Sequence, residues 1–222
     1  MLKIFKNKVI LVTGHTGFKG SWLCTWLIHL GAKVVGVSND TVGDQSNFLA
    51  SEISNVIDDN RFDIRDAITF RQLVEKVQPD FVFHLAAQAL VRPSYENPLE
   101  TLSTNSIGSA NVLDALRVLD KKVVAIMITS DKAYDNVEWV WGYRETDRLG
   151  GKDPYSASKG MAELVIRSYV DSFFSDPSSN VRVGVTRAGN VIGGGDWAVD
   201  RIVPDCMEAW ANLGTVDIRS PH

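Results

Sequence analysis

Residues 8–20 read Lys-Val-Ile-Leu-Val-Thr-Gly-His-Thr-Gly-Phe-Lys-Gly, and this stretch decides the fold. Its first half, Lys8–Thr13, is a short apolar run rich in β-branched side chains, as expected for a strand buried on both faces. Gly14, Gly17 and Gly20 follow, and the residues after them carry apolar side chains at helical spacing. A strand, a glycine-rich turn and a helix in this order predict that the start of the helix binds a pyrophosphate.

Each glycine has a separate role in this interpretation. Gly14 makes the tight turn, Gly17 lets the backbone approach the pyrophosphate, and Gly20 lets the helix pack closely against the strand. The spacing is G-x-x-G-x-x-G rather than the G-x-G-x-x-G of many dehydrogenases. A glycine triplet alone also fits a plain turn before a helix, so the prediction depends on the flanking strand and helix.

The end of the second predicted strand bears on which dinucleotide binds. Lys33–Val37 is followed by Ser38, and Asp40 lies two residues further on. NAD enzymes place a carboxylate near this strand end for the ribose 2′-hydroxyl, whereas NADP enzymes need a basic residue there. No Lys or Arg occurs between Val34 and Arg61, so the sequence favours NAD.

The rest of the chain alternates strands with helices. Further strands are predicted at residues 80–86, 123–129 and 181–187, and long helices at 98–119 and 155–174. Such alternation indicates βαβ units. We therefore expect an α/β fold of the Rossmann type, a doubly wound parallel sheet with helices on both faces.

Tyr155-Ser-Ala-Ser-Lys159 and Ser130 form a candidate proton-transfer group. Four residues of separation put Tyr155 and Lys159 on one face of a helix. An ammonium beside a phenol favours the phenolate, so a tyrosine with a pKa of about 10 can act as a base nearer neutrality. Ser130 ends an apolar strand and can position the same oxygen. Because surface helices often contain Tyr-x-x-x-Lys, the prediction rests on its order after the glycine turn and the serine strand.

Composition and charge indicate a soluble globular enzyme. The chain has 222 residues, 45% of them hydrophobic, enough for a sizeable core in one domain. A net charge of −4 without a basic stripe argues against a nucleic-acid partner. Cys24 and Cys206 are too few and too far apart for a zinc site, so no metal is predicted. The apolar runs are too short for a membrane span or a signal peptide, and we expect a cytoplasmic protein.

Longer strings of residues carry a family resemblance. They are Thr-Gly-His-Thr-Gly-Phe-Lys-Gly-Ser-Trp-Leu at 13–23, His-Leu-Ala-Ala-Gln at 84–88, Ser-Asp-Lys at 130–132, and Arg-Ala-Gly-Asn-Val-Ile-Gly-Gly-Gly-Asp-Trp at 187–197. With them the chain resembles an extended short-chain dehydrogenase/reductase and, more narrowly, a nucleotide-sugar 4,6-dehydratase of the branch that acts on CDP-glucose. The resemblance covers the whole chain. The first and last strings are its most specific parts.

The resemblance implies contacts to NAD and to a nucleotide sugar. The predicted NAD contacts are Gly14, Thr16, Gly17, Phe18, Lys19, Gly20, Ser38, Asp63, Ile64, Leu85, Ala86, Ala87, Gln88, Asn105, Tyr155 and Lys159. The predicted substrate contacts are Gln88, Arg92, Ser94, Ser130, Asn190, Asp196, Trp197 and Arg201. Helix-cap, turn or surface roles stay open for several of these residues, including Asp63 and Ile64. Trp139, Trp141 and Tyr143 form either a lid over the sugar or the core of a long loop.

The resemblance also implies a mechanism, with catalytic residues Ser130, Asp131, Lys132, Tyr155 and Lys159. Tyr155, assisted by Lys159 and Ser130, removes the proton of the hexose 4-hydroxyl while C4 gives hydride to NAD. The 4-keto group acidifies the C5 proton, and Asp131 protonates the departing 6-hydroxyl. Hydride then returns to C6, leaving a 4-keto-6-deoxy sugar of the kind used for deoxysugars and the lipopolysaccharide O-antigen. Because NAD is regenerated, the enzyme is a lyase.

Lys132 departs from the pattern of many 4,6-dehydratases, which have a glutamate at this position as the base for the C5 proton. Either a neutral lysine is the base here, or the cation stabilises the enolate. Asp131 itself also fits a turn at the strand end. Two other functions remain open: a related sugar-nucleotide epimerase or reductase, and a noncatalytic NAD-binding protein.

The resemblance also bears on domains and assembly. Residues 1–187 are expected to form the NAD-binding domain with the Tyr/Lys helix, and 188–222 to begin the sugar-nucleotide-binding portion. Since family chains continue well past residue 222, this chain is expected to be a fragment. The long helices at 98–119 and 155–174 are expected to pair in a homodimer or a dimer of dimers, as they do in the family.

Overall fold

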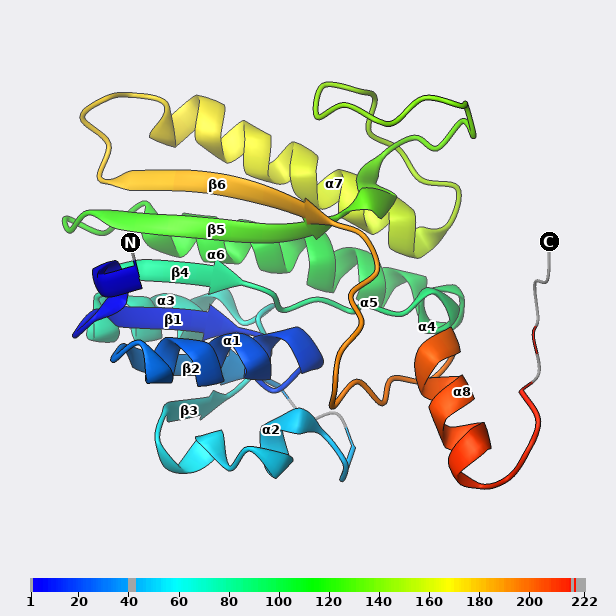
Figure 1. Ribbon diagram of the computed structural model, residues 1–222. Coiled ribbons are helices and arrows are strands. Elements are labelled where there is room, and N and C mark those ends of the chain that lie inside the picture. The colour runs from blue at the N-terminus through cyan, green and yellow to red at the C-terminus, as the bar shows by residue number, and fades with distance from the viewer. Residues whose placement is uncertain (1, 40–42, 217, 219–222) are drawn as a thin grey trace.

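The computed structural model describes residues 2–39, 43–216 and 218. It contains a parallel six-stranded sheet in the order β3-β2-β1-β4-β5-β6. The strands are β1 (Val9–Thr13), β2 (Lys33–Ser38), β3 (Asp58–Arg61), β4 (Phe81–His84), β5 (Val123–Ser130) and β6 (Val181–Ala188). The chain winds outward in both directions from the border between β1 and β4 (Figure 1), which confirms the predicted Rossmann-type fold.

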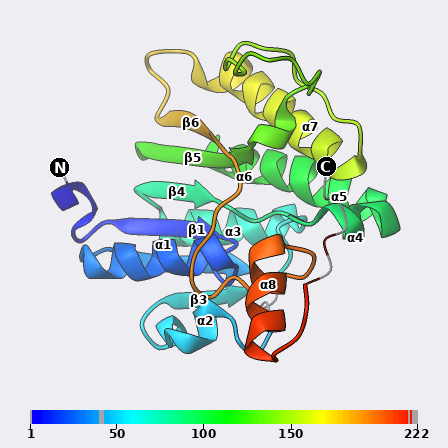
Figure 2. The same cartoon turned by 45° about the vertical axis from the view of Figure 1, so that its right-hand side comes forward.

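Helices cover both faces of the sheet. They are α1 (Phe18–His29), α2 (Asn47–Ala50), α3 (Ala67–Val77), α4 (Val91–Glu96), α5 (Pro98–Leu102), α6 (Gly108–Leu116), α7 (Pro154–Tyr169) and α8 (Ile202–Ala211). α3, α6 and α7 lie side by side on one face, and α1 lies on the other (Figure 2). Along β1 the side chains alternate: Leu11 packs in the core under α3 and α6, whereas Ile10 and Val12 pack with Cys24 and Leu27 of α1.

Short turns complete the secondary structure. The 3₁₀ turns are η1 (Leu2–Phe5), η2 (Ile53–Asn55) and η4 (Asp131–Ala133). A π-helical turn, η3 (Ser103–Ile107), divides the helix predicted at 98–119, and a second one, η5 (Val170–Phe174), forms the end of the helix predicted at 155–174. The helix predicted at 98–119 ends at Leu116 rather than at residue 119. The strand predicted at 80–86 ends at His84, where the chain leaves the sheet. Single π-turns inside helices often occur at functional sites.

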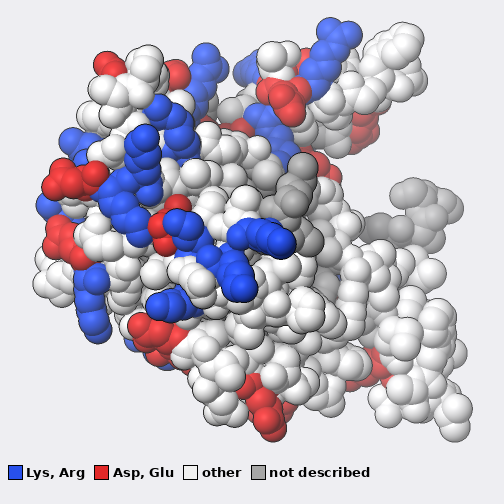
Figure 3. All heavy atoms as spheres, turned by 60° about the vertical axis from the view of Figure 1, so that its left-hand side comes forward, with Lys and Arg blue, Asp and Glu red and all other residues white. Residues whose placement is uncertain are grey.

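The two ends of the sheet differ in character. α8 stands beyond the carboxyl ends of the strands (Figure 1), where parallel sheets of this kind bind ligands. At the amino ends Lys and Arg side chains gather among acidic ones (Figure 3), and Lys8 and Lys121 both contact Asp80.

Among the described residues, no helix is long and apolar enough to cross a membrane, and no group of three or more His, Cys, Asp or Glu is placed to hold a metal.

Candidate active site

The glycine turn leaves space for a pyrophosphate at the start of α1. Gly14 has a φ of +71°, and a Cβ there would lie 2.7 Å from the Ala86 nitrogen. A Cβ on Gly20 would overlap the Gly14 carbonyl, so this glycine lets α1 pack against the turn. At Gly17 a Cβ would meet only that carbonyl, at 3.4 Å, and no side chain caps the helix. These residues therefore fit a dinucleotide whose phosphates accept from the first N–H groups of α1.

The predicted adenosine contacts divide between the site and the core. The Ser38 hydroxyl at the end of β2 hydrogen-bonds Thr16 of the turn at 2.8 Å. Asp63 is paired with the guanidinium of Arg65, and Ile64 is buried in the core, close to Gly108. Ile64 thus has a packing role whether or not it also borders adenine. Asp40, the acidic residue noted after this strand, lies outside the described residues.

Asn105 holds the loop that follows β4. Its Oδ1 accepts from the Gln88 nitrogen at 2.8 Å, and its Nδ2 donates to the Gln88 carbonyl at 3.0 Å and to the Ser158 hydroxyl at 2.7 Å. The Gln88 amide donates to Thr101 and to the Leu90 carbonyl. The π-turn η3 supplies Asn105, so the irregular turn connects the strand end to α7.

Tyr155 and Lys159 lie side by side on α7, which starts where Asp153 accepts from the Ser156 nitrogen. Tyr155 is 9% exposed and Lys159 is 7% exposed, and the ammonium nitrogen is 5.8 Å from the tyrosine ring centroid. Ser130, the last residue of β5, hydrogen-bonds the phenol. The predicted group of three thus meets at the carboxyl end of β5.

Burial dominates the acid–base properties of this group. It raises the pKa of Tyr155 above its usual value, although the hydrogen bond with Ser130 and the charge of Arg201 act in the opposite direction. The pKa of Tyr155 is therefore raised, whereas a neighbouring ammonium alone would be expected to lower it. Burial, with a contribution from the charge of Lys19, lowers the pKa of Lys159 to about 8. Both side chains are therefore destabilised in their charged forms.

Asp131 and Lys132 lie beside Ser130. The Ser130 hydroxyl donates to Asp131 at 3.0 Å and accepts from the Lys132 backbone N–H at 3.2 Å. The Lys132 ammonium is 3.4 Å from the other Asp131 oxygen, and both side chains are about half exposed. A carboxylate and a cation are thus both available next to Ser130.

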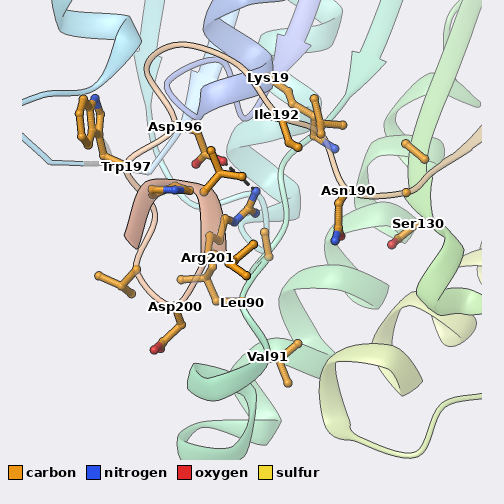
Figure 4. A pocket seen from close by; sticks show the side chains of 18 of the residues that line it. Lys19, Leu90, Val91, Ser130, Asn190, Ile192, Asp196, Trp197, Asp200 and Arg201 are labelled. Carbon is orange, nitrogen blue, oxygen red and sulfur yellow. Dashed lines mark hydrogen bonds and ion pairs between the residues drawn. The ribbon is translucent and has the colours of Figure 1, made fainter. Parts of the chain in front are cut away.

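A cleft of about 1110 Å³ joins these groups at the carboxyl edge of the sheet. It is lined by parts of α1, the loop after β4, β5, α7 and the segment from β6 into α8, including Lys19, Leu85, Ala87, Arg92, Ser130, Lys132, Tyr155, Lys159, Asn190, Asp196, Trp197 and Arg201. Figure 4 shows Asn190 and Ser130 on one side and Arg201 on the other. Arg201 is held by Asp196 at 3.1 Å, and burial and Arg201 lower the pKa of Lys19.

Two predicted substrate contacts do not line this cleft. Ser94 is fully buried and donates to the Val91 carbonyl, and Gln88 is engaged by Asn105 and Thr101. The other six predicted substrate residues lie along its wall. Arg92 lines the cleft while its guanidinium contacts Asp200 at 3.3 Å.

A family model described as GDP-mannose 4,6 dehydratase matches residues 11–181. The chain belongs to this dehydratase family. A curated protein named CDP-glucose 4,6-dehydratase, from Salmonella typhimurium strain LT2, is 47% identical over 98% of this chain, and the match covers 62% of that protein. This chain therefore spans less than two thirds of that relative's length.

Solved structures agree with the fold of the dehydratase family. A UDP-glucose 4-epimerase from Thermotoga maritima with UDP-glucose has a TM-score of 0.83 and 26% identity, covering 96% of this chain and 66% of that one. A UDP-glucose 4-epimerase from Brucella ovis in complex with NAD has a TM-score of 0.68 and 26% identity, covering 81% of this chain and 51% of that one.

Sequence reasoning missed a buried ion pair in this dehydratase-family chain. Glu163 on α7 is 6% exposed; it accepts from the Thr129 hydroxyl at 2.7 Å and pairs with Arg187 of β6. The Arg187 guanidinium also donates to the Glu145 carbonyl and lies 4.6 Å from the Tyr134 ring centroid. The pair joins α7 to β5, β6 and the long loop. Two signals were available: Glu163 follows Lys159 by four residues, and Arg187 opens the last motif string.

His84 and the aromatic loop have structural positions outside the cleft. His84 is buried and hydrogen-bonded to Thr13 and Ser109, and burial with the charge of Lys159 lowers its pKa to about 3. Of the two alternatives for the loop, the structure shows loop packing: Tyr143 stacks on Tyr134 and contacts Trp139. Neither these rings nor Trp141 line the cleft.

Proposed function

We propose that this protein dehydrates a nucleotide-activated hexose, CDP-glucose, to the 4-keto-6-deoxy sugar and water, using NAD that it regenerates. One observation carries the proposal: Ser130, Tyr155 and Lys159 meet in a cleft beside the start of α1, with Asp131 and Lys132 next to them. Family membership and the 47% identity to a CDP-glucose 4,6-dehydratase support it.

The proposed cofactor site is the open turn at Gly17. The first N–H groups of α1 would hold the pyrophosphate, and Ser38 would face the adenosine ribose. NAD, when bound, would accept a hydride and return it, and its pyridinium charge would favour the phenolate of Tyr155. The UDP-glucose 4-epimerase from Brucella ovis, which has a similar fold, was solved in complex with NAD, and this supports NAD as the cofactor. We expect NAD to bind more tightly than NADP, as a calorimetric titration would show.

The proposed chemistry begins at Tyr155. Its phenolate removes the proton of the 4-hydroxyl while hydride leaves C4, which oxidises this carbon to a ketone. Ser130 hydrogen-bonds the phenol and positions it, and Lys159 supplies positive charge beside the ring. Since burial raises the pKa of the phenol, positive charge at the site is required to make it a base near neutral pH.

Elimination and hydride return complete the cycle. The new ketone acidifies the C5 proton, and loss of this proton forms an enolate. The 6-hydroxyl then leaves as water with a proton from Asp131. Return of the hydride to C6 of the resulting alkene, together with return of a proton to C5 from the base that removed it, gives the 4-keto-6-deoxy sugar. Lys132 is either the base for C5 or the cation that stabilises the enolate. Its contact with Asp131 and its half-exposed position favour the cation.

The substrate diphosphate is proposed to bind near α8. Arg201 presents a guanidinium that suits phosphate oxygens, and Asp196 orients it at 3.1 Å. Trp197 and Arg92 also line the cleft, and Asn190 lies on the side of Ser130. A cationic wall opposite Ser130 would hold the diphosphate while the hexose extends toward Tyr155.

Incubation with CDP-glucose and NAD tests the proposed function. The expected product is a 4-keto sugar with an alkaline ultraviolet absorbance, and Tyr155→Phe serves as the inactive control. An epimerase would instead release an isomer without this absorbance. A noncatalytic NAD-binding protein would bind NAD and form neither product, and either result would contradict the dehydratase proposal.

We also propose that the protein is cytoplasmic. We further propose that it forms a homodimer through α5, η3, α7 and η5, because apolar side chains are exposed on these elements. They include Leu99, Ile107, Met161, Leu164 and Phe173. Isolated exposed apolar residues are common, but a row on adjacent helices marks an interaction surface. Light scattering should give twice the chain mass, and Leu164→Glu should shift it to the monomer. The division into an NAD-binding domain and a sugar-nucleotide portion at residue 187 stays a prediction.

A further inference from the structure

The sheet places an arginine beside the end of β2, where the sequence alone places none. Arg61 closes β3 and lies in register with Ser38, the last residue of β2. Residues in register on parallel strands present their side chains to the same face. On this fold the end of the second strand lies near the ribose 2′ position, and a nearby arginine can bind a 2′-phosphate there. The sequence favours NAD because no basic residue closely follows the second strand in the chain. In the folded structure, however, Arg61 lies beside the end of that strand.

Arg61 is nevertheless engaged with a carboxylate. Its Nε lies 2.7 Å from Asp59 Oδ1 and its Nη2 lies 2.9 Å from Asp59 Oδ2, the bidentate geometry that a phosphate would otherwise use. The guanidinium also lies 5.0 Å from the centroid of the Phe48 ring. Both partners are partly exposed, the arginine at 34% and the aspartate at 21% of the side chain.

His15 fixes the carboxylate. Its ring is fully buried next to Gly36 and Phe48, and its Nε2 lies 2.8 Å from Asp59 Oδ1. Burial raises the pKa of the Asp59 carboxyl, but hydrogen bonds from Arg61 and His15 outweigh it and leave the pKa below its usual value. Asp59 is therefore held as an anion between the glycine turn and the arginine.

We infer that Asp59 determines the preference for NAD by holding Arg61 in an ion pair. The inference rests on the proposed function, which supplies the dinucleotide and its orientation. In the pair the arginine charge is neutralised and its Nε and Nη2 face Asp59, so a 2′-phosphate cannot use this bidentate edge and meets the carboxylate. Without the carboxylate, the same guanidinium is a free bidentate donor beside the ribose.

Asp59→Asn tests the inference through cofactor binding rather than turnover. NAD and NADP are titrated calorimetrically into the protein and its variants. Because a hydrogen bond to a charged group contributes about tenfold or more in affinity, Asp59→Asn should move the NADP-to-NAD affinity ratio toward NADP by about tenfold. Asp58→Asn is the matched control, since it makes the same charge change on the exposed neighbour, which points to the opposite face.

Arg61→Gln supplies a second test that does not depend on the stability of Asp59→Asn. This change leaves Asp59 without its countercharge, so the ratio should move further toward NAD. In Asp59→Asn combined with Arg61→Gln the gain in NADP affinity should disappear. Equal ratios for Asp59→Asn and Asp58→Asn, or an unchanged ratio for Arg61→Gln, would overturn the inference. Tight NAD binding by the unaltered chain supports the proposed cofactor whatever these variants do, and its absence would overturn both proposals.

Discussion

Replacing Lys159 with methionine should stabilise the protein while it destroys the site. The Lys159 side chain is almost fully buried, and its pKa falls from 10.5 to about 8. At about 1.4 kcal/mol per pKa unit, this shift means that the charged lysine costs the fold about 3 kcal/mol at neutral pH. Methionine has a similar volume and no charge, so Lys159→Met should recover up to that amount.

The pH dependence of this gain follows from proton binding. Between pH 8 and 10.5 the unfolded chain binds more protons at Lys159 than the folded chain does, so the stability of the unaltered protein rises with pH in this window. The full cost is present below pH 8 and is gone above 10.5. The advantage of Lys159→Met should therefore be largest at pH 7 and shrink as the pH passes through this window.

Urea unfolding of both proteins at pH 7 and at pH 9.5 measures the difference. For a chain of this size about 3 kcal/mol corresponds to a rise in melting temperature of about 6–12 °C. Lys152→Met, which alters an exposed lysine just before α7, is the matched control and should change little. A Lys159→Met variant that is no more stable at pH 7, or whose gain is equal at both pH values, would show that the buried charge of Lys159 does not destabilise the fold.

Four other predictions concern the catalytic groups and their support. Tyr155→Phe should keep NAD binding by calorimetry and lose about 10²–10⁴-fold in turnover. Asp131→Asn should still oxidise C4, so bound NADH absorbance should build up on adding CDP-glucose. Lys132→Met should slow the exchange of the C5 proton with solvent deuterium if Lys132 acts as a cation, and should abolish this exchange if Lys132 is the base. Unchanged kinetics in both Asp131→Asn and Lys132→Met would remove Asp131 and Lys132 from the mechanism. Arg187→Met leaves Glu163 buried without its partner and should cost about 3–5 kcal/mol in urea unfolding, whereas a stable variant would contradict the structural role.

Local patterns in the sequence were sufficient to predict the sheet and the glycine turn. Apolar runs such as Val9–Thr13 must be buried on both faces, and alternation with helices leaves few topologies. The helix at Tyr155 was equally readable because its start carries Asp153 as a cap and Pro154 at the first position. These features depend on residues close together in the chain.

Features that depend on contacts between residues far apart in the sequence could not be predicted from it. Arg61 approaches Ser38 only through the register of two strands, and the Glu163–Arg187 pair joins a helix to an edge strand. The raised pKa of Tyr155 reflects burial, which the Tyr-x-x-x-Lys spacing does not report. The π-turn that carries Asn105 has no sequence signature comparable to a cap or a glycine turn.

In the proposed reaction hydride leaves C4 and returns to C6 of the same sugar. This transfer can be followed with CDP-glucose deuterated at C4, unlabelled NAD, protonated water and mass spectrometry of the product. We expect a 4-keto-6-deoxy sugar that keeps one deuterium, located at C6. A product with deuterium still at C4, as an epimerase would give, or a dehydrated product whose label has been lost to the solvent, would contradict it.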